Sequence, residues 1–195
     1  MKILLIGASG RLGTAVHKTL SARGHDLITV GRTSGDLRLD MTDPAQVAEA
    51  YDRAIERAGH LDAVASAAGY VPYKPVGAMT ADDYRAGFLG KVFSQIELVR
   101  QGTGRIAERG SFTLITGVLS RDPVPTASAA AMANGAVDGF VRAAALDIAP
   151  QRVNAVSPTV FTEALADYGD FFPGIEPVGL AQVADANPAR RKLRA

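Results

Sequence analysis

The chain has 195 residues, of which 47% are apolar and 21% are charged, and it contains no cysteine. Its length is typical of a single domain, here residues 1–195, and the missing thiols exclude a disulfide scaffold and a cysteine-ligated metal site. The 21 Lys and Arg against 20 Asp and Glu give a formal net charge of +1. That charge provides no bulk attraction to nucleic acid or to an anionic membrane. No apolar run approaches the ~20 residues that cross a bilayer, so we expect a cytoplasmic protein.

The spacing of apolar residues changes repeatedly along the chain. Ile3–Ile6 is a continuous apolar run, which is typical of a strand that is buried on both faces of a parallel sheet. The segment Leu12–Arg23 has apolar residues at helical spacing and is followed by Gly24, a common end of a helix. Further strands are expected at 27–30 and 37–39.

A second helix is expected to begin after Asp43, because its carboxylate can cap the helix and Pro44 suits the first helical position. Gln46 completes the pattern of a capping box, and Gly59 ends this helix. The remaining expected elements are a strand at 61–67, a long helix that Thr80 caps and that runs to about Gln101, a strand at 112–116, an Ala-rich helix at 128–149, a strand at 152–156 and a short helix at 180–186.

Strands that alternate with helices of this length are typical of right-handed β–α–β units. The sequence therefore predicts a single-domain α/β protein with a doubly wound, mostly parallel sheet of six or seven strands and helices on both faces. The segment 187–195 contains Arg190-Arg191-Lys192-Leu193-Arg194, and we expect it to be a flexible basic tail rather than a nucleic-acid patch.

A glycine-rich turn connects the first strand to the first helix. Its three glycines recur every three residues, which lets the backbone approach a diphosphate and lets the helix pack tightly on the sheet. The helix start also supplies N–H groups and a positive dipole end for phosphates, as in a Rossmann fold. The alternative is a turn that holds no ligand. The residues expected to bind the cofactor here are Gly7, Ser9, Gly10, Arg11, Leu12 and Gly13.

The end of the second strand indicates which dinucleotide is bound. A site for NAD usually has an acidic residue there, which accepts a hydrogen bond from the ribose 2′-hydroxyl. This chain has Arg32, Thr33 and Ser34 instead, and a planar guanidinium suits a 2′-phosphate. We therefore expect NADP(H); the alternative is that Arg32 is a solvated turn residue.

Further segments match one family in order and spacing: Leu39-Asp40-Met41-Thr42, Ser66-Ala67-Ala68-Gly69, Gly135–Phe140 and Arg152–Pro158. Together with the glycine turn they resemble the short-chain dehydrogenase/reductase family over roughly residues 1–162. The resemblance implies a Rossmann fold, a nicotinamide cofactor and oxidoreductase activity. It implies further cofactor-binding residues at Asp40, Met41, Ala67, Ala68, Gly69, Pro158 and Thr162.

The catalytic residues of that family are not matched. The resemblance implies a Tyr and a Lys four residues apart on the helix after the fifth strand, but Ala130 and Asn134 occupy these positions. Gly117 occupies the position of the family's Ser, directly after Thr116. Lys91 falls near the position of the family's Asn, so the Lys and the Asn look exchanged.

The exchange predicts one polar pocket if Lys91 and Asn134 face each other, with Lys91 donating to the cofactor ribose or to a substrate oxygen. The alternative is that Lys91 is an exposed helix cation. The segment Tyr70–Lys74 matches the pattern Tyr-x-x-x-Lys, but its proline prevents a regular helix. Tyr70 or Tyr73 is therefore either a substitute acid or an apolar lining residue of the substrate pocket. The candidate catalytic residues are Lys91, Asn134, Thr116 and Tyr73, and no metal site is expected.

Two classes of function follow. The first is an NADP(H)-dependent oxidoreductase with a rebuilt active site that acts on a small carbonyl or alcohol, because the cofactor itself carries the hydride chemistry. The second is a non-catalytic NADP(H)-binding sensor or partner-binding protein, and an isomerase or epimerase is a weaker third interpretation. The two long helices are those through which the family pairs its subunits, so a homodimer is expected.

Overall fold

The computed structural model describes residues 1–164 and 176–185, so the predicted tail at 187–195 lies outside the described residues. A parallel sheet forms the centre of the molecule, with the strand order β3-β2-β1-β4-β5-β6. This arrangement confirms the predicted doubly wound sheet, with six strands. The strands are β1 (Lys2–Ile6), β2 (Asp26–Gly31), β3 (Leu37–Arg38), β4 (Ala63–Ser66), β5 (Ser111–Ile115) and β6 (Arg152–Val156).

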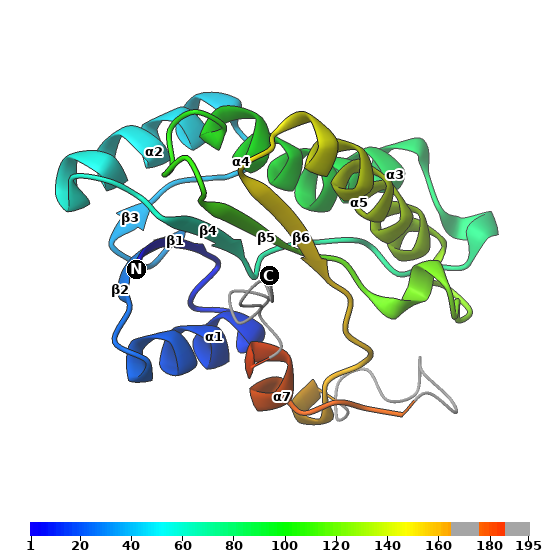
Figure 1. Cartoon of the computed structure of the whole chain (residues 1–195). Helices are drawn as coiled ribbons and strands as arrows, with labels where there is room; N and C mark the ends of the chain where they lie inside the picture. The colour runs from blue at the N-terminus through cyan, green and yellow to red at the C-terminus, as the bar shows by residue number, and fades with distance from the viewer. Residues whose placement is uncertain (165–175, 186–195) are drawn as a thin grey trace.

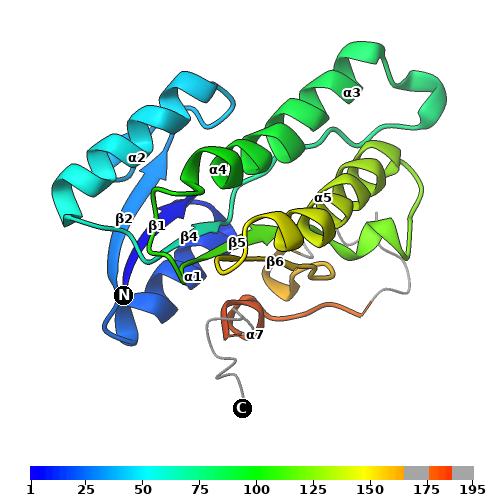
Figure 2. The same ribbon diagram turned by 45° about the horizontal axis from the view of Figure 1, so that its top comes forward.

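Helices cover both faces of the sheet (Figure 1). On one face lie α1 (Arg11–Ala22) and α7 (Leu180–Asp185). The opposite face carries α2 (Pro44–Ala58), α4 (Ser94–Gly102) and α5 (Ser128–Asp147), and Figure 2 shows α4 between the other two. No helix in the described part of the chain is both long enough and apolar enough to cross a bilayer.

The predicted helix from Thr80 to about Gln101 forms, but its middle turn is not α-helical. It consists of α3 (Ala81–Gly87), the π-helical segment η2 (Phe88–Phe93) and α4 in direct succession. The short 3₁₀ turns are η1 (Val76–Ala78), η3 (Val118–Ser120) and η4 (Thr162–Ala164).

Strand β1 shows why the central strands are apolar at every position. Leu4 and Ile6 pack into the main core on the side of α2, α4 and α5, whereas Ile3 and Leu5 pack with Leu20 of α1 on the other side. All five side chains are buried. Burial on both faces removes the alternation that a half-exposed strand would have.

The order of the strands determines where a ligand can bind. The chain leaves β1 for a helix on one face and leaves β4 for helices on the opposite face, so the crevice between these two strands is a topological switch point. Ligands of doubly wound sheets bind at this crevice, outside the carboxyl ends of the strands.

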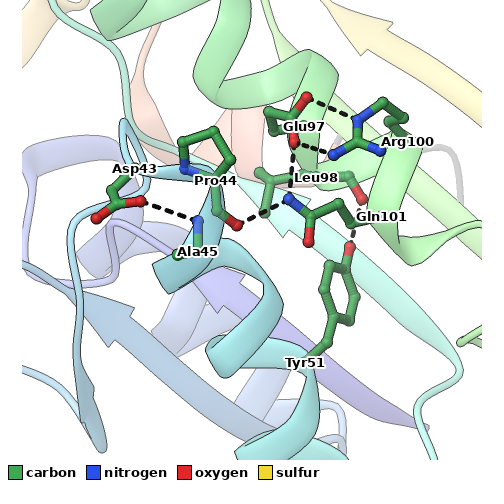
Figure 3. Close-up of polar contacts among 8 residues, drawn as sticks. All are labelled: Asp43, Pro44, Ala45, Tyr51, Glu97, Leu98, Arg100 and Gln101. Atoms are coloured by element: carbon green, nitrogen blue, oxygen red, sulfur yellow. Dashed lines mark hydrogen bonds and ion pairs between the residues drawn. The ribbon is translucent and has the colours of Figure 1, made fainter.

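The start of α2 is only partly as predicted. Asp43 is the N-cap residue, its Oδ1 accepts from the Ala45 N–H at 2.9 Å, and Pro44 follows it in the first turn (Figure 3). The predicted capping box with Gln46 is wrong. The Asp43 N–H donates to the Asp40 carbonyl at 3.1 Å, and the Gln46 Oε1 accepts from the Asp40 N–H at 2.8 Å instead.

The start of α3 is a complete capping box, which confirms Thr80 as its cap. The Thr80 Oγ1 accepts from the Asp83 N–H at 3.1 Å, and the Asp83 Oδ2 accepts from the Thr80 N–H at 2.9 Å. Lys74 Nζ donates to both Asp83 oxygens at 2.7 and 2.9 Å, and these hydrogen bonds lower the pKa of Asp83 to about 2. The loop after β4 is thereby attached to the start of α3.

The contact between α2 and α4 places α4 closely on the sheet (Figure 3). Tyr51 is fully buried, and its hydroxyl donates to the Leu98 carbonyl. The Gln101 Nε2 donates to the Pro44 carbonyl at 2.8 Å. At Gly102, a Cβ would lie 2.3 Å from the Tyr51 hydroxyl oxygen, so only glycine permits this approach.

Gly102→Ala is therefore expected to reduce the free energy of unfolding by about 1–3 kcal/mol, as overpacking of a core does. Urea denaturation measures this loss. The matched control is Gly77→Ala, because a Cβ at Gly77 would meet no atom within 4 Å; its change should stay within about 0.5 kcal/mol. Equal stability of the two variants would contradict the packing of α4 on Tyr51.

Candidate cofactor and active site

A cavity of about 580 Å³ lies where the carboxyl ends of the central strands meet the start of α1. It contains all four predicted catalytic residues, namely Lys91, Thr116, Asn134 and Tyr73. It also contains seven of the predicted cofactor-binding residues, which are Gly10, Arg11, Leu12, Ala67, Ala68, Gly69 and Pro158. The sequence thus brings its two groups of candidates to one place.

The glycine turn after β1 is fixed by two close approaches of the backbone. Gly7 has φ +78°, and a Cβ there would lie 2.8 Å from the Ala68 Cβ. A Cβ at Gly13 would lie 1.9 Å from the Gly7 carbonyl oxygen, so α1 packs directly on the turn. Gly10 is the N-cap residue of α1, and no side chain caps the helix. The first N–H groups of α1 therefore suit the phosphates of a dinucleotide.

The loop after β2 exposes cationic and hydroxyl side chains beside this turn. Arg32 and Thr33 are both exposed. The first acidic residue after β2 is Asp36, and its Oδ2 accepts from the Thr29 N–H at 2.9 Å and from the Thr29 hydroxyl at 2.7 Å. The other Asp36 oxygen is 2.8 Å from an Arg57 nitrogen. Both carboxylate oxygens of Asp36 are thus occupied by Thr29 and Arg57. Asp36 is not placed as the acidic residue at the strand end that is typical of an NAD site.

The remaining cofactor candidates are not among the residues that line the cavity. The Asp40 Oδ1 accepts from the N–H and hydroxyl of Thr42 at 2.9 and 2.8 Å, and the Met41 side chain is buried in the main core. Any contact of Met41 with an adenine would therefore use its backbone. These candidates are Gly7, Ser9, Gly13, Arg32, Thr33, Ser34, Asp40, Met41 and Thr162.

Lys91 extends from η2 into the cavity and is not the exposed helix cation of the alternative interpretation. Its Nζ donates to the Thr116 carbonyl at 3.2 Å. Its stem lies over Gly69, where a Cβ would be 3.2 Å from the Lys91 Cγ. Burial lowers the pKa of the Lys91 ammonium to about 8, and the negative charge of Asp138 acts in the opposite direction.

Asn134 lies in the same cavity as Lys91 and is 2% exposed. Its Oδ1 has no hydrogen-bond partner among the described residues, so it is a buried acceptor that a ligand hydroxyl or amide can satisfy. A Cβ at Gly117 would lie 2.8 Å from the Asn134 Nδ2. The carboxamide of Asn134 thus fills the space that a side chain at 117 would need.

Ala130 is fully buried, and Tyr73 packs in its cluster. An aromatic ring from the loop after β4 therefore packs beside the start of α5. Thr116 contributes its carbonyl rather than its hydroxyl to Lys91, because the hydroxyl donates to the Val156 carbonyl at 3.4 Å.

Two polar residues at the site were missed in the sequence. Asp138 lies one helical turn after Asn134, so the helical spacing in the sequence could have placed it on the same face. The Asp138 Oδ2 accepts from the Ser120 hydroxyl at 3.0 Å. Gln95 is fully buried behind Lys91, but one Gln within a helix gives no signal in a single sequence. No cluster of three metal-ligating side chains occurs within 1–164 and 176–185.

Comparison with known proteins gives one consistent result. A family model described as enoyl-(acyl carrier protein) reductase matches residues 11–194. Versicolorin reductase stcU of Emericella nidulans is 28% identical over 179 aligned positions, which cover 80% of this chain and 68% of that protein. The crystal structure of the protein lin1944 from Listeria innocua is 41% identical, with a TM-score of 0.89, and the match covers 95% of this chain and 91% of that one.

The structure of ElxO with NADP bound shares the fold, with a TM-score of 0.84 at 17% identity, over 94% of this chain and 88% of that one. The family model covers most of the chain. This chain therefore belongs to the short-chain dehydrogenase/reductase family.

Proposed function

We propose that the protein is an NADP(H)-dependent oxidoreductase that interconverts a small, partly apolar carbonyl compound and its alcohol. The observation that carries this proposal is the placement of the Lys91 ammonium and the unsatisfied Asn134 Oδ1 in the cavity that the glycine turn borders. The family binds nicotinamide cofactors. Preference for NADP(H) is supported by the exposed Arg32 and Thr33, by the committed Asp36, and at the level of fold by ElxO.

The residues of this chain provide binding and proton transfer. The cofactor, when bound, supplies the hydride. Lys91 would donate a hydrogen bond and then a proton to the oxygen of the substrate, while the Thr116 carbonyl holds its ammonium in place. Asn134 would accept from a hydroxyl of the cofactor ribose or of the substrate. Apolar lining residues such as Val71 and Leu119 exclude water from the reacting oxygen.

A non-catalytic NADP(H)-binding protein is the second candidate, because Gly117 and Ala130 occupy the positions of the family's Ser and Tyr. Loss of a general acid costs about 10²–10⁴-fold in rate and does not by itself abolish hydride transfer. Enhanced nicotinamide fluorescence on mixing with NADPH, without oxidation by a panel of aldehydes, ketones and quinones, would support this candidate. Oxidation by one of these compounds supports the enzyme.

Pairing of subunits belongs to the same proposal. Large apolar side chains are exposed on η2 and α5, which are parts of the two long helices: Leu89 (45%), Phe93 (52%), Met132 (40%) and Leu146 (83%). These side chains support a homodimer in which the helices bury one another's apolar surface. The proposed function also includes a cytoplasmic location, where the enzyme would use the pool of reduced nicotinamide cofactor.

Arg32→Ala is expected to weaken NADPH binding by about 10–100-fold and to change NADH binding little, because hydrogen bonds to a charged group contribute about 1.5–3 kcal/mol. Isothermal titration calorimetry with both cofactors measures this difference. Arg53→Ala is the control, since Arg53 lies on α2 and pairs with Glu49 at 3.1 Å. Equal losses for NADPH and NADH would contradict selection of the 2′-phosphate by Arg32.

Reduction of the carbonyl is expected to be fastest below pH 8 and to slow as the pH rises through about 8, because only protonated Lys91 can donate. Lys91→Met should lower the single-turnover rate by about 10²–10⁴-fold and remove this pH dependence. Lys91→Arg keeps a hydrogen-bonding cation, but its guanidinium does not release a proton, so it should lose the contribution of proton transfer to the rate at every pH. A wild-type profile that persists in Lys91→Met would rule out Lys91 as the donor.

A further inference from the structure

The π-helical segment η2 turns two carbonyl groups to partners outside the regular helical pattern. The Gly90 carbonyl accepts from the Tyr70 N–H at 3.3 Å and from the Ser94 hydroxyl at 3.2 Å. The Lys91 carbonyl accepts from the Gln95 Nε2 at 2.9 Å. A π-helical turn within an α-helix often occurs at a functional site, and here it carries Lys91.

Gln95 connects this turn to the end of β5. Its Nε2 also donates to the Ile115 carbonyl at 2.9 Å, and its Oε1 accepts from the Ile115 N–H at 2.8 Å. The ladder between β4 and β5 has its last pair at Ala65 and Thr113, so the carboxamide takes the place of a strand beyond it. Gln95 is fully buried, and each of its polar atoms is hydrogen-bonded.

These contacts fix Lys91 at both ends. Gln95 holds the Lys91 carbonyl against Ile115, and the next residue, Thr116, accepts from the Lys91 Nζ at 3.2 Å. The backbone and the ammonium of Lys91 are thus both positioned relative to the same two residues of the sheet edge. An apolar side chain at 95 would remove the hydrogen bonds that the partly buried N–H and carbonyl of Ile115 make with the carboxamide.

We propose that Gln95 is a positioning residue, whose carboxamide holds η2 on the end of β5 and so determines where the Lys91 ammonium lies in the cavity. The consequence for the reaction rests on the proposed function, but the position of Lys91 does not. The charged group that acts on Lys91 is Asp138 of α5, and Tyr70 and Tyr73 line the same cavity from the loop after β4.

The test compares Gln95→Met with Gln101→Met, a matched change on the same helix. Gln101 donates to the Pro44 carbonyl at 2.8 Å (Figure 3), and neither residue lines the cavity. Lysine-specific ¹³C labelling and NMR titration, with the Lys91 signal assigned by its loss in Lys91→Arg, follow the pKa of Lys91 without cofactor or substrate. The wild-type protein and Gln101→Met should titrate near 8, and Gln95→Met should move at least one unit toward 10.5.

A folded Gln95→Met protein with an unmoved Lys91 titration would overturn the proposal, whether or not turnover is found. A moved titration without turnover in the wild-type protein would support the positioning role and reject the proposed function. With a substrate in hand, kcat of Gln95→Met should fall at least tenfold while the KM for NADPH stays within twofold.

If Gln95→Met does not fold, Gln95→Asn provides the same titration, because it keeps a neutral carboxamide that is one methylene too short for all three contacts.

Hydrogen exchange in the wild-type protein tests the same contacts without a variant. The side-chain amide protons of Gln95 should exchange with solvent as slowly as the backbone amide proton of Ile115, and rapid exchange of the Gln95 protons would overturn the proposal.

Discussion

The contact of α1 with the turn after β1 is the constraint on which the rest of the site depends. Gly13 packs on the Gly7 carbonyl, and Gly7 packs on Ala68 at the end of β4. This contact brings the start of a helix, the switch point of the sheet and the loop after β4 within one cavity. Lys91 lines this cavity together with the start of α1. The Gly7 N–H donates to the Val30 carbonyl of β2, so the loop that carries Arg32 begins next to the turn.

Backbone groups position Lys91 in the cavity. Lys91 donates to a carbonyl at the end of β5, and its stem lies over Gly69. The ammonium therefore loses hydration, and it forms no ion pair with a carboxylate of residues 1–164 or 176–185, which is why its pKa falls to about 8. A cation of this kind is suited to donate to a neutral carbonyl oxygen near physiological pH.

Much of this arrangement could be predicted from the sequence. Continuous apolar runs and helical spacing located the elements to within one or two residues, because buried parallel strands and amphipathic helices differ in period. Gly13 was interpretable because its approach to the Gly7 carbonyl is short-range in the chain, whereas the approach of Gly7 to Ala68 is long-range and was seen only in the structure.

Other features depend on long-range partners and were not predictable in this way. Gln46 fits the pattern of a capping box, but the Asp40 N–H competes successfully for its oxygen. The π-helical turn at Phe88–Phe93 lies next to Gln95, which contacts Ile115 of β5 twenty residues away in the chain, and local periodicity contains no trace of that contact. The place of Lys91 depends in turn on this helix, so the sequence indicated the residue but not its geometry.

The packing of Asn134 against Gly117 also limits which side chains the cavity can take at these two positions. A serine restored at 117 would meet the Asn134 carboxamide, and a lysine restored at 134 would put a second ammonium into the cavity that already holds Lys91. Neither substitution alone is therefore expected to leave the cavity as it is, and a serine at 117 would need a different side chain at 134.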